Sequence, residues 1–165
     1  MPIKSLLAKE PEIKSMLTKT GEWELYSVHL YLYMANLAQK LGLPGSQKYF
    51  LKEVPEEVGH YQKVSDFVND RGDMLPMVAI EAIKEDAKGL MDILKILYET
   101  MILITDHYEK FYELAQEKKC YVAIPFVNEF LVLQTKAIGL YGDLITQLET
   151  NDKDILEMDE YIGEL

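Results

Sequence analysis

The sequence has one cysteine, three histidines and no long uninterrupted apolar segment. Cys120 has no second cysteine with which to form an internal disulfide, so the disulfide frameworks of small secreted proteins are excluded. Charged residues interrupt the longer apolar stretches every few positions, and the N-terminal segment lacks the apolar core of a secretion signal. We therefore expect a cytoplasmic protein without a membrane-spanning segment.

Clusters of basic residues are also missing. The formal net charge is -11, and a nucleic-acid-binding surface needs grouped Lys and Arg residues to neutralise phosphates. An acidic surface favours cations as partners, although acidic composition is also an ordinary means of keeping a protein dissolved. The 165 residues, 48% of them apolar, are enough for one domain with a substantial core, which we expect to span residues 1–165.

Strand-like alternation of apolar and polar residues is absent, and helical periodicity fills the segments between groups of Gly and Pro. We predict an all-α protein with a bundle over residues 10–150. Its four long helices should lie near residues 10–41, 46–71, 89–118 and 123–150, followed by a short fifth helix at 154–165. The first turn is short, so the first two helices should be antiparallel neighbours. Residues 72–88 are numerous enough to run the length of the bundle, which predicts one long crossover connection.

Polar residues interrupt the apolar stripes of three predicted helices. Glu24 lies within the stripe of the first helix, Glu57 within that of the second and Gln134 within that of the fourth. His60 follows Glu57 by three residues, so both side chains project from the same side of the helix. A buried carboxylate is costly unless it is paired or bound to a metal, and these stripes carry no Lys or Arg. Glu with a His three residues later is the ligand arrangement of di-iron sites in bundles, which favours iron or manganese. The alternative is that Glu57 or His60 faces solvent or a subunit interface.

Five segments of the chain carry motifs of one known protein family. The first contains a Glu followed seven residues later by a Tyr, and the second contains Glu-Glu-x-x-His and an Arg-Gly turn. The segments are ELYSVHLY (24–31), EEVGHYQKVSDFVNDRGD (56–73), MLPMVAIEA (74–82), NEFLVLQTKAIGLYGDLITQL (128–148) and ILEMDEYIGEL (155–165). Together they make the chain similar to the non-haem bacterial ferritins, with a fourth helix that resembles eukaryotic heavy chains. The resemblance covers nearly the whole chain and implies a ferritin-like four-helix bundle with a short fifth C-terminal helix.

The resemblance also implies an iron site. Glu24 and His60 would bind the first iron, and Glu57 would bridge two irons. Glu56 would face the cavity of the shell and help to gather iron. No haem is expected, because Val58 stands where the haem-binding bacterioferritins carry their axial Met.

Two further residues would act beside the irons. Tyr31 would hydrogen-bond a ligand or supply an electron, and Gln134 would be a polar neighbour of the centre. We regard both as candidate catalytic residues. For Tyr31 the alternative is a core tyrosine with a satisfied hydroxyl.

The chain departs from the ferritin pattern on the third and fourth helices. Met101 stands where the family places the glutamate of the second iron, and a thioether cannot replace a carboxylate for hard iron ions. Ala137 lacks the further carboxylate of many bacterial ferritins, and Leu133 and Lys136 offer nothing to a third iron.

The second helix contains a proline, and the third helix contains polar residues outside the face of Met101. Pro55 should remove one backbone hydrogen bond and kink the second helix just before the bridging glutamate. Asp106, His107 and Glu109 do not repeat the face of Met101, so we expect them at the surface or at an interface.

The resemblance implies iron storage and detoxification by a hollow homo-oligomeric shell of about 24 subunits around a ferric mineral core. Fe(II) oxidation should be weak because the site is incomplete. The alternative is a non-catalytic shell subunit, similar to ferritin light chains, with only a structural metal site. A rubrerythrin-like peroxidase or a mononuclear oxygenase is disfavoured, because the sequence has no second Glu-x-x-His motif.

Overall fold

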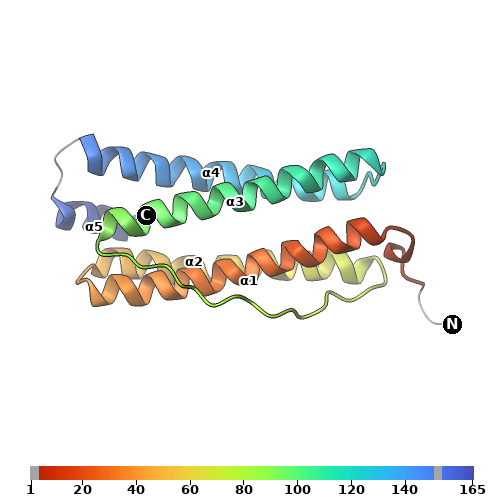
Figure 1. Ribbon diagram of the computed structural model, residues 1–165, viewed down its shortest axis with the longest axis horizontal. Helices are drawn as coiled ribbons and strands as arrows, with labels where there is room; N and C mark the ends of the chain where they lie inside the picture. Colours follow the sequence, from red (N-terminus) through yellow and green to blue (C-terminus); the bar gives the residue numbers. More distant parts are fainter. Residues whose placement is uncertain (1–3, 151–153) are drawn as a thin grey trace.

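The computed structural model describes residues 4–150 and 154–165, so residues 1–3 and 151–153 of the predicted domain lie outside the described part. The described residues form helices and no strand. Their order is the short 3-10 helix η1 (Leu7–Lys9), α1 (Pro11–Lys40), α2 (Pro44–Asp70), α3 (Leu90–Glu117), α4 (Ala123–Thr150) and α5 (Ile155–Glu164). Figure 1 shows α1 and α2 as one layer and α3 and α4 as the other. The predicted fold class, an all-α four-helix bundle with a short last helix, is confirmed.

Proline and glycine define several helix ends. Pro11 and Pro44 are the first residues of α1 and α2, where proline's fixed φ suits the helix and its missing N–H costs nothing. Gly42 and Gly72 follow the ends of the same two helices with φ of 74°, a left-handed conformation that favours glycine. The Gly and Pro residues between the predicted helices therefore lie at the turns of the structure.

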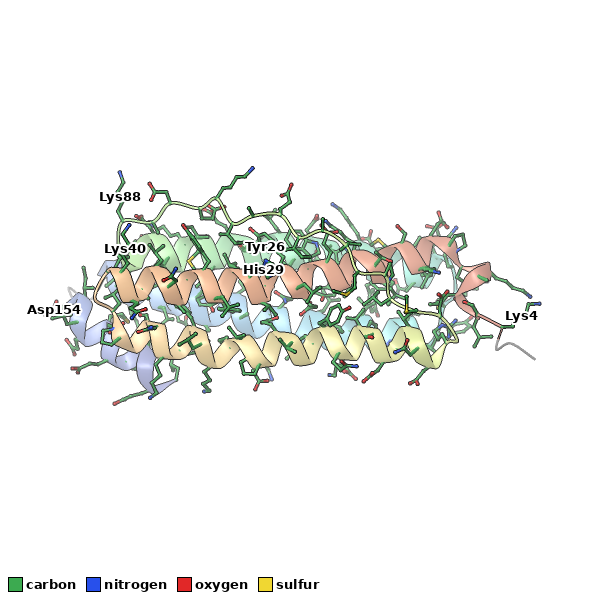
Figure 2. The ribbon with its side chains drawn as sticks, turned by 90° about the horizontal axis from the view of Figure 1, so that it is seen from below. Lys4, Tyr26, His29, Lys40, Lys88 and Asp154 are labelled. Atoms are coloured by element: carbon green, nitrogen blue, oxygen red, sulfur yellow. The ribbon has the colours of Figure 1, made fainter. Side chains whose placement is uncertain are left out.

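The crossover between α2 and α3 has no helix or strand and runs the length of the bundle along the outside of α1 (Figures 1 and 2). Its first residues are fixed by Asp73, whose carboxylate accepts hydrogen bonds from Ser5 and Lys14. Leu75 is buried against α1 at Gly21, where a Cβ would lie 2.8 Å from Cδ2 of Leu75. Because the crossover returns to the starting end of α2, helices α2 and α3 run parallel, and the predicted long crossover is present.

The last helix, α5, docks onto the beginning of α2. Buried Asp159 accepts hydrogen bonds from the backbone N–H groups of Gly45 (2.8 Å) and Ser46 (2.7 Å) and from the Ser46 hydroxyl (2.6 Å). It thereby satisfies free N–H groups of the α2 N-terminus, since Leu43 before that helix makes no side-chain cap. A Cβ on Gly45 would lie 1.9 Å from the Asp159 carbonyl oxygen, and one on Gly163 would lie 2.8 Å from the Gly45 Cα.

The core of the bundle is apolar along most of its length, and its long helices are continuous. Pro55 lies on the exposed side of α2, and α2 runs through it to Asp70 as a single helix. The loss of one hydrogen bond at Pro55 therefore does not end the helix before the predicted metal ligands. Across the described residues, no helix combines the length and the apolar character needed to cross a bilayer.

Candidate metal centre

Helices α1 and α2 bring three potential metal ligands together inside the bundle. Glu24 comes from α1, and Glu57 and His60 come from successive turns of α2. One ligand atom from each residue lies within 4.8 Å of the other two. Nδ1 of His60 is 3.2 Å from Oε2 of Glu57 and 3.4 Å from Oε2 of Glu24. The structure therefore brings together the three residues that the sequence indicated as metal ligands.

The cluster contains two buried carboxylates and only one imidazole. Glu24 is 1% exposed and Glu57 is 8% exposed. Burial, together with the charge of Glu24, raises the pKa of Glu57 to about 7 despite its hydrogen bond to His60. Burial lowers the pKa of His60, but contacts with both carboxylates outweigh this effect and raise it to about 10. Without a metal ion, a proton on His60 is thus the positive charge between the two glutamates.

Two buried side-chain oxygen atoms among the described residues have no hydrogen-bond partner. They are Oε2 of Glu24 and Oε1 of Gln134. An unpaired buried acceptor is costly, and in the part of the chain that the structure describes no Lys or Arg pairs with Glu24 or Glu57. An ion that binds each ligand at about 2.1 Å holds those atoms within about 4.2 Å of one another, so small side-chain movements suffice to bind a cation. The donor set fits a divalent metal such as Fe(II), Mn(II) or Zn(II).

Tyr108 of α3 is a member of the centre that sequence reasoning missed. It is fully buried, and its hydroxyl donates a hydrogen bond to Oε1 of Glu24. Burial and the nearby charge of Glu24 hold the pKa of Tyr108 well above its usual value, so the phenol remains a donor. Its place in the apolar stripe of α3, seven residues after Met101, is the signal that could have found it.

The remaining predicted site residues occupy different surroundings. Tyr31 is buried, and its hydroxyl lies 2.8 Å from that of Tyr141 on α4. Burial and the charge of Glu57 raise the pKa of Tyr31 well above its usual value. Glu56 is exposed beside the buried Glu57, and Met101 is buried on α3 with 2% of its surface exposed. Helix α3 therefore carries a buried thioether, without charge, at position 101.

The expectation for His107 is wrong, whereas Asp106 and Glu109 are exposed as expected. His107 is 8% exposed, and its Nε2 lies 2.9 Å from the hydroxyl of Thr20 on α1. His107 does not lie on the face of Met101, but it follows the buried Ile104 by three residues and shares the buried face of that residue. Burial, with the nearby charge of Lys19, lowers the pKa of His107 to about 4.

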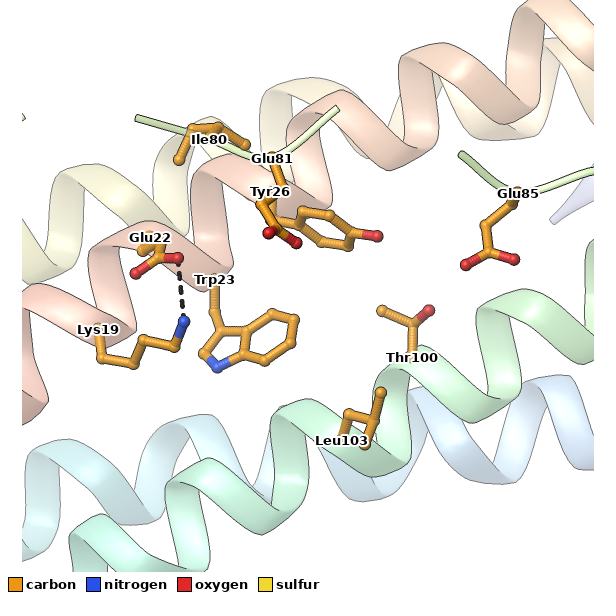
Figure 3. A pocket seen from close by; sticks show the side chains of 9 residues that line it. All are labelled: Lys19, Glu22, Trp23, Tyr26, Ile80, Glu81, Glu85, Thr100 and Leu103. Carbon is orange, nitrogen blue, oxygen red and sulfur yellow. Dashed lines mark hydrogen bonds and ion pairs between the residues drawn. The ribbon is translucent and has the colours of Figure 1, made fainter. Parts of the chain in front are cut away.

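A separate cavity of about 240 Å³ lies between α1, α3 and the crossover (Figure 3). The aromatic rings of Trp23 and Tyr26 and the ion pair of Lys19 with Glu22, at 2.9 Å, form part of its lining. None of the three candidate metal ligands lines this cavity. The cavity is therefore separate from the cluster of Glu24, Glu57 and His60.

Comparison with known proteins gives a consistent result. A family model described as the ferritin-like domain matches residues 15–151. A probable bacterial non-heme ferritin-like protein of Haemophilus influenzae is 27% identical over 145 residues, which cover 86% of this chain and 88% of that protein. A bacterial non-heme ferritin of Staphylococcus aureus is 28% identical over 125 residues, covering 76% of this chain and 75% of the relative.

Solved structures show the same fold. An open pore ferritin from the archaeon Archaeoglobus fulgidus superimposes with a TM-score of 0.87 at 23% identity, covering 92% of this chain and 96% of that one. A humanized archaeal ferritin gives a TM-score of 0.86 at 23% identity, covering 93% and 96%. The family model spans most of the chain, and the chain therefore belongs to the ferritin family.

Proposed function

We propose that this protein is an iron-storage subunit whose centre binds one Fe(II) ion well and a second one poorly, and therefore oxidises iron slowly. The observation that carries the proposal is the buried cluster of Glu24, Glu57 and His60, in which one carboxylate oxygen lacks a hydrogen-bond partner. The names of the relatives in Haemophilus influenzae and Staphylococcus aureus support a non-haem ferritin. Iron is the substrate and cargo of this centre.

The first ion would take the place of the proton on His60. Because the two glutamates hold the pKa of that imidazole at about 10, binding of Fe(II) must release a proton at neutral pH. The three ligands then surround a cation with two carboxylate oxygens and one imidazole nitrogen. Glu57 has a second oxygen with which it can reach a neighbouring ion.

The second ion would have too few anionic ligands. Buried Met101 contributes no charge from α3, and Ala137 contributes none from α4. Reduction of oxygen by two electrons favours two Fe(II) ions side by side, so loss of one position slows this step without preventing storage. Tyr31 would supply a further electron, and exposed Glu56 would help to gather iron near the centre.

The metal-binding part of the proposal can be tested by calorimetric titration of Zn(II) or Fe(II) under anaerobic conditions. Glu57→Ala should abolish the tightest binding, whereas His60→Ala should weaken only the first position. Glu129→Gln is a matched control, because Glu129 is an exposed carboxylate on the same bundle that pairs with Lys63. Unchanged stoichiometry in both site variants would place the metal site elsewhere.

The proposed assembly is a closed homo-oligomeric shell of about 24 subunits that encloses a ferric mineral core. Light scattering at neutral pH should give the corresponding mass, and a dimer as the main species at micromolar concentration would contradict the shell.

The second candidate is a non-catalytic shell subunit, which the buried Met101 favours. A protein that binds one Zn(II) per subunit but leaves the rate of Fe(II) oxidation at the protein-free level would support this candidate.

A further inference from the structure

We propose that Tyr108 is the positioning residue through which α3 still acts on the metal centre: its hydroxyl holds one oxygen of Glu24, so that only the other oxygen is free to bind the ion. This inference rests on the proposed function, because it assumes that Glu24 is a metal ligand. It assigns a role to a residue that the Glu-x-x-His pattern does not include.

The two oxygens of Glu24 have different surroundings. Oε1 accepts the hydrogen bond from Tyr108. Oε2 has no hydrogen-bond partner and lies 3.4 Å from Nδ1 of His60, on the side of the centre where Glu57 also lies. A carboxylate held through one oxygen in this way presents the other oxygen to the cation.

Tyr108 is itself held in place by packing. Its ring stacks on Phe130 of α4 with the centroids 5.0 Å apart and the planes inclined by 16°. Phe130 in turn packs edge to face against His60, with centroids 6.0 Å apart. Because these three rings are in contact, the Tyr108 hydroxyl has little freedom to leave Glu24. Residues that orient a ligand in this manner commonly change metal affinity by about 10- to 100-fold when they are replaced.

The position of Tyr108 on α3 also explains how its hydroxyl extends to the metal centre. Long side chains on a helix point back towards its N-terminus, so the hydroxyl lies nearer to the level of Met101 than the Tyr108 backbone does. Met101 and Tyr108 are seven residues apart and are both buried on the same face of α3. This face of α3 has no carboxylate and contacts the centre through the neutral Tyr108 hydroxyl. The hydroxyl holds Glu24 in place but adds no negative charge for a second ion.

The test compares Tyr108→Phe with Tyr141→Phe in the full-length, metal-free protein. Both tyrosines are fully buried, both lose one hydroxyl hydrogen bond, and only Tyr108 contacts a proposed ligand. Tyr108→Phe should lower the unfolding midpoint at least as much as Tyr141→Phe, because it removes a hydrogen bond to a buried carboxylate. Co(II) serves as the probe, because calorimetry gives its affinity and its visible absorption reports the coordination of the ion.

Tyr108→Phe should weaken Co(II) binding by about 10-fold or more and change the visible Co(II) spectrum, because Glu24 can then rotate and bind through either oxygen. Tyr141→Phe should leave both properties at the wild-type values. Equal changes in the two variants, or no change in Tyr108→Phe, would overturn the inference. It would also be overturned by a phenolate-to-Fe(III) absorption band that Tyr108→Phe removes, since Tyr108 would then be a ligand.

The result also separates this inference from the proposed function. Wild-type protein that binds no Co(II) would overturn both. Binding that Glu57→Ala abolishes and Tyr108→Phe leaves unchanged would overturn only the role of Tyr108.

Discussion

Replacement of Met101 by glutamate should create the second metal position that α3 now lacks. Met101 is 2% exposed and lies on the face of α3 that reaches the centre through Tyr108. A carboxylate at this position would add an anionic oxygen, and Glu57 can already bridge two ions. We expect calorimetry to show two Zn(II) or Fe(II) ions per subunit in Met101→Glu and one in the wild type.

Without metal, Met101→Glu should be less stable than the wild type, and the pKa shift of Glu57 indicates the size of the loss. At 8% exposure the pKa of Glu57 is raised to about 7 from 4.5. A shift of this size corresponds to about 3 kcal/mol, at about 1.4 kcal/mol for each pKa unit. A glutamate at position 101 would be at least as buried, so Met101→Glu should lose about 3 kcal/mol of unfolding free energy at neutral pH. A metal ion at about 100 times its dissociation constant should restore about 2.7 kcal/mol through the added site.

Two measurements and two controls test this prediction. Urea unfolding with and without Zn(II) gives the metal-dependent stabilisation, and stopped-flow absorption gives the rate of Fe(II) oxidation. Met101→Gln is the matched control, because it has the shape of the glutamate without its charge, and Met101→Leu retains an apolar side chain. If Met101→Glu binds no more metal and oxidises Fe(II) no faster than Met101→Gln, then position 101 does not face the centre. The interpretation that Met101 leaves the second iron position incomplete would then be wrong.

Two further predictions concern stability. The pKa of His107 is about 4 in the folded protein, chiefly because of burial, but near 6.5 in the unfolded chain, so the folded state loses stability as pH falls from 6.5 to 4. Between pH 7 and pH 4 the wild type should lose about 3 kcal/mol more than His107→Gln, as measured by urea unfolding at each pH, and equal losses would contradict the buried neutral state. Asp159→Asn should cost about 2 kcal/mol, because the amide cannot accept from both Gly45 and Ser46 as the carboxylate does. Hydrogen exchange should accelerate in residues 155–164 of this variant, and unchanged protection there would show that the cap does not hold α5.

The helices and the three ligands could be predicted from the sequence because they depend on local spacing. Glu57 and His60 are three residues apart on one helix, and Glu24 interrupts an apolar stripe. The contact of Tyr108 with Glu24 could not be predicted, because it depends on the register between two helices and on the direction of a side chain. Asp159 likewise gave no local signal, since it caps a helix that begins more than 100 residues earlier in the chain.

The contact between Gly45 and Gly163 also constrains how this chain and its descendants can change. The backbones of α2 and α5 approach so closely there that a methyl group on either residue would collide with the other helix. A substitution at one position therefore cannot be offset by a smaller residue at the other, because glycine is already the smallest. Lineages that keep the last helix in this position should retain both glycines together, and a lineage that loses one should hold its C-terminal helix farther from the bundle.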